Sequence, residues 1–323
     1  MPFQQDPGRQ QQEQQQADPL SYDAAEHSAL VAHEKWTTIA ANASGAGPFV
    51  LPYTQEDFLD ELPLLVEELQ HADKRVPVKH KRRKGRGVIV DESPWEAFHR
   101  RHSTRFFPFR HYLSQEFPEL CSDEPIELLE VGCGTGSAVL PMLKAHESLH
   151  VTAVDISQTA IAALRCHPDF NSSRCEAFVG DPAQDSDPWP WTDNRRFDVV
   201  TLIFVLSALR PEEMASLLRN VGRVLKPNGR VLVRDYGFLD SAQFGLAARG
   251  GHLDGRLYKR SDGTLAYFFT LDELRQLCQA AGLRPIDTKY TARKLVNRAK
   301  GREYGRIWVQ GRFQKMTDDG EGS

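Results

Sequence analysis

The chain has 323 residues and a formal net charge of −4, with 40% hydrophobic and 26% charged residues. These proportions are ordinary for a soluble globular protein, and the length allows one large or two small domains. No apolar run approaches the roughly 18 residues of a membrane-spanning helix, so none is expected.

The first residues lack the apolar region of a secretory signal and the Arg/Ser-rich pattern of an organellar presequence. Five cysteines are scattered without C-x-x-C or metal-ligand spacing. We therefore expect reduced thiols in an intracellular protein and no metal site.

An N-terminal extension precedes the main domain. Residues 1–20 are rich in Gln, which predicts a disordered tail. The extension continues over 21–92, with helices predicted near 22–41 and 54–70. It ends in a dense basic run, KRVPVKHKRRKGR at 74–86, which has too few apolar residues to fold alone.

A second basic strip, 289–315, carries nine Lys or Arg residues against the single acid Glu303. The mildly acidic net charge therefore conceals a segregation of charge along the chain. Two cationic strips predict local binding of a polyanion such as a nucleic acid. The alternative, an ordinary solvated surface, stays open for each strip taken alone.

Aromatic and basic side chains are interleaved over 93–120 (SPWEAFHRRHSTRFFPFRHYLSQEFPEL). Trp95 and Phe98 lie three residues apart, so on a helix they share one face with His99 beside them. The pattern predicts a helix that closes over a ligand. The alternative is a helix that only packs on the core.

An apolar run over 126–131 leads into Gly132-Cys133-Gly134-Thr135-Gly136 and then a helix-like segment. This order predicts a buried strand, a glycine turn and a helix N-terminus, where backbone N–H groups can bind a nucleotide-bearing ligand. The G-x-G-x-G spacing differs from the dinucleotide fingerprint, so the glycines alone do not identify the ligand.

Strand and helix patterns alternate through the central part of the chain. Strands are predicted at 126–131, 150–155, 175–180, 197–206 and 229–235, helices at 137–147, 157–166 and 211–225, and two closing β-runs at 287–296 and 305–313. Near-continuous apolar strands that alternate with helices predict an α/β fold with a parallel sheet covered on both faces. We interpret 93–315 as one catalytic domain and 316–323 as a disordered tail.

Asp155, Asp181 and Asp235 each lie at or just past the carboxyl end of a predicted strand, where parallel sheets bind ligands. Asp155 follows Gly132 by 23 residues, and a carboxylate there accepts hydrogen bonds from ribose hydroxyls. By itself this fits a nicotinamide cofactor equally well. With Asp181, the helix-ending turn at 225–229 and the closing hairpin, the pattern resembles class I S-adenosylmethionine-dependent methyltransferases. The resemblance implies a mostly parallel, Rossmann-like sheet of seven strands and S-adenosyl-L-methionine as cofactor.

A narrower resemblance covers about Trp95 to Phe313. The segments that carry it are FF-x-x-RH-x-L-x-x-EFPEL (106–120), LEVGCGTG (129–136), LIFVLSAL (202–209), RDYG (234–237), YKRSDGTLAYFFT (258–270) and VNRAKGREYGRIWVQ (296–310). They resemble the tRNA N3-methylcytidine methyltransferase family. The family has Tyr at the position of His99, Leu at that of Pro182 and an acid at that of Phe109.

The resemblance also implies site residues. The implied cofactor contacts are Trp95, His99, Gly132, Gly134, Asp155, Asp181, Pro182 and Ile203. The implied substrate contacts are Arg110, Arg234, Tyr236 and Arg298. The charge of the basic run, outside the resemblance, adds Lys81, Arg82, Arg83 and Lys84 as candidate tRNA contacts.

The implied reaction needs no strong base, because N3 of cytosine carries a lone pair and no proton. The methylated base becomes cationic, so a nearby carboxylate stabilises the developing charge. Asp235 is our candidate; its alternative role is to bridge Arg234 and stiffen the turn. Tyr236, Phe268 and Phe269 are candidates to stack an extruded base, with core packing as the alternative for at least one phenylalanine.

The implied partner is tRNA, and the implied target is cytidine 32 of the anticodon loop. A need for an aminoacyl-tRNA synthetase or another helper protein is left open, and so is the compartment, cytoplasm or nucleus. Two rival functions remain: a small-molecule or other RNA methyltransferase, and a non-catalytic tRNA-binding scaffold. The intact set of Gly132, Asp155 and Asp181 argues against the scaffold.

Overall fold

The computed structural model of the chain describes residues 37–38, 49–51, 65, 67, 69, 93–102, 107–184, 189, 192, 194–297 and 302–316. Leu65, Glu67 and Leu69 are helical, as expected for the helix near 54–70. Thr37–Thr38 forms a strand, so the helix expected over 22–41 is wrong at these two residues. The basic run at 74–86 and both predicted tails lie outside the described residues.

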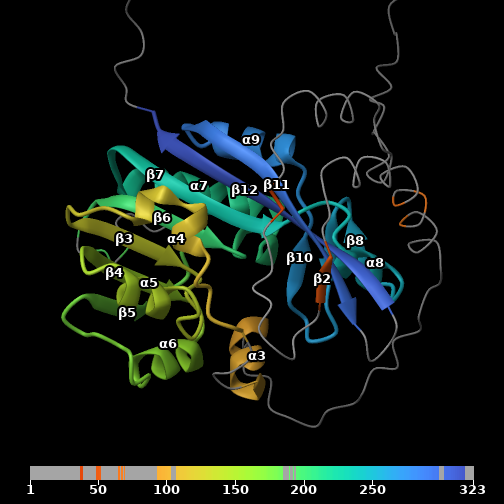
Figure 1. Cartoon of the computed structure of the whole chain (residues 1–323), viewed down its shortest axis with the longest axis horizontal. Coiled ribbons are helices and arrows are strands. Elements are labelled where there is room, and N and C mark those ends of the chain that lie inside the picture. The colour runs from red at the N-terminus through yellow and green to blue at the C-terminus, as the bar shows by residue number, and fades with distance from the viewer. Residues whose placement is uncertain are drawn as a thin grey trace, which may run out of the picture.

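One large sheet forms the centre of the molecule (Figure 1). Its strands are β1 (Thr37–Thr38), β2 (Phe49–Leu51), β3 (Ile126–Val131), β4 (Leu149–Asp155), β5 (Cys175–Val179), β6 (Phe197–Ile203), β7 (Leu225–Tyr236), β11 (Leu283–Asn297) and β12 (Arg302–Lys315). Their order is β1-β11-β12-β7-β6-β3-β4-β5, and β2 pairs β11. Strands β3 to β7 are parallel to one another, whereas β12 runs antiparallel to both β7 and β11.

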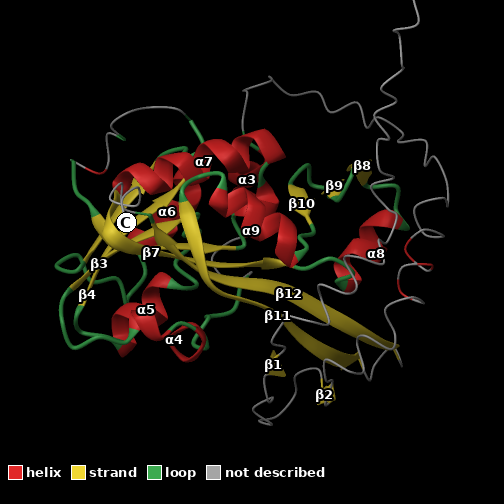
Figure 2. Ribbon diagram, turned by 90° about the horizontal axis from the view of Figure 1, so that it is seen from above, coloured by secondary structure: helices red, strands yellow, loops and turns green. Residues whose placement is uncertain are grey.

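Helices cover both faces of this sheet, and Figure 2 shows the two layers. The helices are α3 (Pro94–His102), α4 (Leu113–Glu116), α5 (Val139–Ala145), α6 (Gln158–Arg165), α7 (Pro211–Val224), α8 (Ser241–Ala247) and α9 (Leu271–Gln279). Helices α4, α5 and α6 pack on one side, in a core that includes Leu128. Helices α7 and α9 pack on the other, with Leu129 and Val131. The alternation along β3 follows from the two-residue period of a strand, and burial on both faces explains why its sequence is nearly all apolar.

Local signals define the helix ends. Ser157 caps α6 by accepting a hydrogen bond from the Ala160 N–H at 3.0 Å. Thr270 and Glu273 form a reciprocal capping box at the start of α9. Gly282, with φ of 74°, ends the turn after α9 in a conformation that suits glycine. The Thr270 cap and the stop at Gly282 were predicted correctly, because each depends on residues only a few positions apart.

The region after β7 contains structure that the sequence did not predict. A second sheet has the order β10-β9-β8, formed by β8 (His252–Asp254), β9 (Leu257–Lys259) and β10 (Leu265–Tyr267). Asp240 caps α8 through the Ala242 N–H at 2.8 Å. The same carboxylate accepts hydrogen bonds from Arg306 Nε at 2.7 Å and the Ile307 N–H at 2.8 Å. Asp240 thus joins this region to β12.

The predicted class I methyltransferase fold with its seven-stranded sheet is confirmed, with two corrections of strand ends. Within the described residues, β1 and β2 from the N-terminal extension add to the seven predicted strands by pairing with β11. Strand β6 ends at Ile203, since Phe204 adopts a φ of 62°. Strand β7 begins at Leu225, which pairs with Phe197 before the chain turns at Asn228. Within the described residues, no helix is both long and apolar enough to cross a membrane.

Candidate active site

The predicted site residues that the structure describes gather at the carboxyl ends of β3, β4, β5, β6 and β7. The glycine turn after β3 is the centre of this edge. Gly132 has φ of 66°, and a Cβ there would lie 2.7 Å from Val205 Cγ2. A side chain would therefore push apart the ends of β3 and β6. Gly134 has φ of 54° and donates its N–H to Asp155 Oδ2 at 2.8 Å.

Asp155, the last residue of β4, is held by the backbone. Its Oδ1 accepts the Ser157 N–H at 2.8 Å, while Oδ2 accepts that of Gly134. The side chain is buried, and burial raises the pKa of this carboxyl although both N–H groups and His99 oppose the shift. Each carboxylate oxygen has a second lone pair, so the group can still accept hydrogen bonds from a diol.

Helix α3 brings Trp95 and His99 to the same edge. Trp95 and Phe98 are in edge-to-face contact at 5.3 Å between ring centroids, as expected for residues three apart. A Cβ on Gly134 would lie 3.7 Å from His99 Cε1, so the imidazole is beside the glycine turn. Burial lowers the pKa of His99 despite the nearby carboxylates of Asp155 and Glu96, which favours the neutral ring.

The other predicted cofactor contacts offer mainly backbone. Pro182 is buried, and its carbonyl accepts Asn220 Nδ2 at 3.1 Å. Ile203 is buried, and its carbonyl accepts Arg110 Nη1 at 3.3 Å. Asp181 is half-buried and uses Oδ1 to accept the Ala183 N–H at 3.0 Å, which shapes the turn after β5.

Two exposed apolar side chains flank this edge and were missed in the sequence. Ile156 follows Asp155 and is 41% exposed, and Val179 at the end of β5 is 49% exposed. Val179 pairs with Asp155 in the sheet. An apolar residue after a strand-end acid is visible in the sequence, but its exposure depends on the fold.

Glu130 is a second buried acid at the glycine turn. Burial raises its pKa to about 8, against a smaller opposing effect of Arg110. Its Oε2 has no hydrogen-bond partner in the part of the chain that the structure describes. A buried carboxyl without a full set of partners favours its protonated form.

Asp235 is held by backbone N–H groups and does not bridge Arg234. It is fully buried; Oδ2 accepts the Ser207 N–H at 2.9 Å, and Oδ1 accepts the Tyr236 N–H at 2.8 Å. No hydrogen bond or ion pair to Arg234 is among its contacts in the described chain, so the proposed bridge is wrong. Burial raises the pKa of Asp235 to about 6, which leaves the carboxylate ionised at neutral pH.

Aromatic rings and guanidinium groups stack beside Asp235. Arg110 Cζ lies 4.7 Å from the centre of the Phe204 ring, and Phe204 lies 5.1 Å from the Tyr236 ring. Arg260 and Arg306 lie 5.6 and 5.9 Å from the Tyr236 ring. We call these five residues the arginine–aromatic cluster. Phe204 holds a left-handed φ of 62° that costs a non-glycine residue roughly 1–3 kcal/mol, a strain common at functional sites.

Arg234 is buried rather than open to a substrate. Its Nη1 donates to Gln310 Oε1 at 2.5 Å, and its guanidinium lies 4.9 Å from the Tyr112 ring and 5.1 Å from the Trp308 ring. Burial lowers its pKa. As the structure stands, Arg234 supports the sheet behind the cluster.

The three aromatic residues predicted to stack the base differ in burial. Phe268 and Phe269 are fully buried in the core, so the expectation that they stack a base is wrong for both. Tyr236 is half-buried and remains a candidate. Phe109, where the family has an acid, is 45% exposed and contacts His111 and His167 at 5.9 and 5.8 Å between ring centroids.

Three of the cations in the second basic strip are paired with acids in the structure. Lys289 pairs with Glu116 at 3.1 Å, Arg306 with Asp240 at 2.7 Å and Arg312 with Glu119 at 2.7 Å. Each of these cations therefore has an acid from elsewhere in the chain. Arg298 lies outside the described residues, and so do Lys81, Arg82, Arg83 and Lys84.

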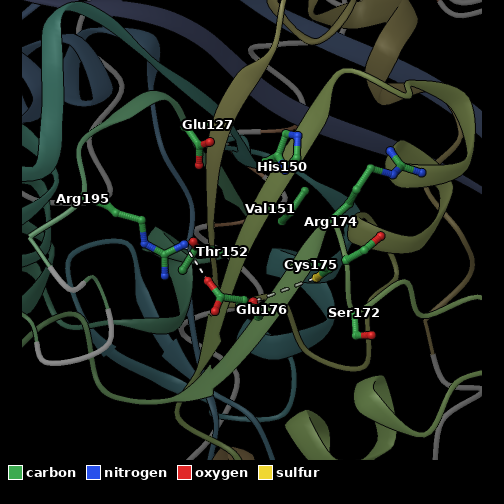
Figure 3. Close-up of a pocket in the computed structure, with 10 residues that line it drawn as sticks. Glu127, His150, Val151, Thr152, Ser172, Arg174, Cys175, Glu176 and Arg195 are labelled. Atoms are coloured by element: carbon green, nitrogen blue, oxygen red, sulfur yellow. Dashed lines mark hydrogen bonds and ion pairs between the residues drawn. The ribbon is translucent and has the colours of Figure 1, made fainter.

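Two further features have no link to this edge. Within the described ranges, no group of three or more His, Cys, Asp or Glu side chains is placed to hold a metal ion. A pocket of about 280 Å³, shown in Figure 3, is lined by Glu127, His150, Val151, Thr152, Ser172, Ser173, Arg174, Cys175, Glu176 and Arg195. It lies at the amino ends of β3, β4 and β5, whereas the glycine turn lies at the carboxyl end of β3.

Known proteins are similar to this chain in sequence. A family model described as a methyltransferase domain matches residues 98–288. The tRNA N(3)-cytidine methyltransferase METTL2 of Danio rerio is 39% identical over 69% of this chain and 73% of its own length. The chain belongs to the tRNA N(3)-cytidine methyltransferase family. Further members are Mettl2 of Drosophila melanogaster, 40% identical over 68% of this chain and 70% of its own, and METTL6 of Mus musculus, 40% identical over 70% and 81%.

Membership confirms the resemblance that the sequence motifs indicated, and the enzyme class with it. The matched methyltransferase domain spans the glycine turn, Asp155 and Asp235. It begins inside α3, between Trp95 and His99. The roles of individual side chains stay predictions, and the geometry above shows which contacts each one makes.

Proposed function

We propose that this protein transfers the methyl group of S-adenosyl-L-methionine to N3 of cytidine in tRNA. The observation that carries the proposal is the placement of Asp155. In a member of this family, a buried carboxylate is fixed by the Gly134 and Ser157 N–H groups beside a glycine turn. This is the arrangement that a ribose-bearing cofactor needs.

The residues at the edge fit the cofactor. Asp155 accepts the ribose hydroxyls with its remaining lone pairs. Ile156 and Val179 present the exposed apolar surface that an adenine ring packs against. Gly132 is exposed, so the methionine part can approach its backbone, and α3 covers the site with Trp95 and His99. The bound cofactor supplies an electrophilic methyl group on a sulfonium.

The reacting base belongs beside the arginine–aromatic cluster. The lone pair of cytosine N3 would attack the methyl carbon opposite the C–S bond, which breaks as S-adenosylhomocysteine leaves, so the protein mainly positions the base. Asp235, ionised at neutral pH, stabilises the positive charge that develops on the ring. Tyr236, which extends from the same strand, offers a ring for stacking the extruded base.

We propose cytidine 32 of the anticodon loop as the target. Unpaired loop bases cost little to extrude, so most of the binding energy comes from the surrounding backbone. Because internal acids balance Lys289, Arg306 and Arg312, the basic run at 74–86 becomes the stronger candidate for phosphate contacts. If the chain alone binds tRNA weakly, an aminoacyl-tRNA synthetase or another helper protein supplies further contacts to the tRNA.

The test is methylation of purified tRNA transcripts by the full chain with S-adenosyl-L-methionine, followed by mass spectrometry of the nucleosides. We expect N3-methylcytidine, and its loss when cytidine 32 is replaced by uridine. Product that persists after this replacement moves the target to another cytidine. No product with any tRNA, with or without added cell extract, contradicts the proposed reaction. Imaging of the tagged protein decides between the proposed cytoplasmic location and the nucleus.

A further inference from the structure

Glu96 connects the cover helix α3 to the start of α6. Its Oε2 accepts the Ser157 hydroxyl at 2.6 Å and the Thr159 N–H at 3.1 Å, and its Oε1 accepts the Thr159 hydroxyl. We call these three residues the Glu96 junction. The two helices lie side by side in Figure 1. The junction joins residues more than 60 positions apart in the chain.

The junction is continuous with the predicted cofactor site. Ser157 caps α6, donates its hydroxyl to Glu96 and donates its N–H to Asp155. Asp155 in turn accepts the N–H of Gly134. His99, one helical turn after Glu96, lies beside Gly134. The contacts therefore form a closed ring from α3 through α6 and the end of β4 to the glycine turn and back to α3.

The charge of Glu96 suits this position. It lies in the first turn of α3 and faces the N-terminus of α6, so the positive ends of two helix dipoles favour its carboxylate. Burial alone would raise its pKa, but the hydrogen bonds from Ser157 and Thr159 hold the pKa of Glu96 below its ordinary value. The junction is thus charge-assisted throughout the neutral range.

We propose that Glu96 is a positioning residue that holds α3 closed over the bound cofactor. Within the described residues, Trp95 and His99 make no hydrogen bond or ring contact with α6, so their placement above the glycine turn depends on Glu96 and on the packing of Phe98. The proposal rests on cofactor binding at Asp155, as proposed above. It adds a residue to which the sequence motifs assign no role.

The test measures binding of S-adenosylhomocysteine by calorimetry and the KM for S-adenosyl-L-methionine. Loss of a charge-assisted contact in Glu96→Ala should weaken binding about tenfold. KM should rise by a similar factor, while kcat at saturating cofactor changes much less. Glu96→Gln, which keeps the shape and one acceptor, should fall between wild type and Glu96→Ala. Glu212→Ala, at an exposed glutamate in the first turn of α7, is the matched control.

Thr159→Val keeps the fold and removes one hydroxyl bond to Glu96, so it tests the junction from the other side. Its effect should largely disappear in the Glu96→Ala background, since both changes break the same contact. Equal affinity of folded Glu96→Ala and wild type overturns the proposal, as does a loss of kcat with unchanged KM. Absence of wild-type binding overturns the proposed function as well, so the two failures are distinguishable.

Discussion

The two halves of the active edge hold their acids in the same way but differ in the contacts around those acids. In the cofactor half, at the ends of β3, β4 and β5, a carboxylate is fixed by backbone N–H groups, and the partners are 2 and 21 residues apart. In the base half, at the ends of β6 and β7, Asp235 is likewise fixed by backbone N–H groups, but the arginines near it are held by side chains from distant parts of the chain. There, Arg306 contacts Asp240 from 66 positions away and Arg234 contacts Gln310 from 76.

The difference has a chemical reason. S-adenosyl-L-methionine presents the same ribose and adenine to every enzyme that uses it, so a glycine turn followed by a strand-end acid suffices. A base within a folded RNA must be extruded and stacked, and the positive charge that develops on it must be stabilised. These tasks need side chains from several strands. The cofactor half should therefore respond to single substitutions through binding, and the base half through turnover.

The largest expected effect is in the base half. Asp235→Asn should lower kcat by about 10²–10³-fold while cofactor affinity is kept, because removing preorganised charge stabilisation affects mainly the transition state. Asp254→Asn, at an exposed position, is the control. Since the pKa of Asp235 is raised to about 6, wild-type kcat should also fall as the pH drops through 6. Collapse of cofactor binding in Asp235→Asn would instead make Asp235 a structural or cofactor-binding residue.

In the cofactor half, Asp155→Ala should weaken binding of S-adenosyl-L-methionine by about 1–3 kcal/mol, as for hydrogen bonds to a charged group. The substitution also leaves the Gly134 and Ser157 N–H groups without their acceptor, so the turn itself loosens. Calorimetry on the folded variant, beside the exposed control Asp123→Ala, measures the loss. Unchanged affinity would remove Asp155 from the cofactor site.

Glu130 links the two halves and gives a prediction about pH. Its pKa is about 8 in the folded protein and about 4.3 in an unfolded chain. Between these values the folded state keeps a proton that the unfolded state has lost. Its contribution to stability is therefore full below the unfolded pKa, falls as the pH rises and levels off above 8.

Glu130→Gln should remove this dependence. Relative to wild type, the variant should gain up to about 1.4 kcal/mol of unfolding free energy for each pH unit between 5 and 8. Denaturant unfolding at several pH values measures the gain, with Glu124→Gln at an exposed site as the control. A difference between Glu130→Gln and wild type that does not change with pH would mean that Glu130 is already ionised in the fold.

The smallest expected effect concerns the binding of tRNA. Neutralising Lys81, Arg82, Arg83 and Lys84 should reduce the log–log salt slope of tRNA binding by up to about 0.7–0.9 for each lost phosphate contact. Cofactor binding should not change. The double variant Arg312→Gln/Glu119→Gln removes a neutralised pair and should leave the slope unchanged. Equal slopes for wild type and the quadruple variant would return the run to ordinary solvated charge.

Sequence patterns predicted the cofactor half far better than the base half. The positions of Gly132 and Asp155 follow from a strand, a turn and a helix in succession, so spacing alone locates them. The distribution of charge over 289–315 could not be predicted, because Glu116, Glu119 and Asp240 come from distant parts of the chain. The burial of Phe268 and Phe269 could not be predicted either, since two successive phenylalanines suit a core and a stacking surface equally well.

Glu96 and Phe204 illustrate the same limit in single residues. An acid in the first turn of a helix is ordinary, and only the approach of α6 makes Glu96 a junction. Phe204 lies within an apolar run that predicts continued strand, whereas its positive φ is imposed by the turn toward η3 at Leu206–Ala208. Such features depend on the tertiary structure and leave no local pattern.

The position of β12 between β7 and β11 has a consequence for synthesis of the protein. Strand β11 is translated before β12, yet it cannot join the sheet until β12 has paired with β7. From the end of β7 at Tyr236 to the end of β12 at Lys315 is 315 − 236 = 79 residues. At about 5–20 residues per second, the ribosome needs about 4–16 s for this stretch. During that interval the cofactor half can already fold, and the open edge of β7 is where the nascent chain is most prone to pair with a neighbour.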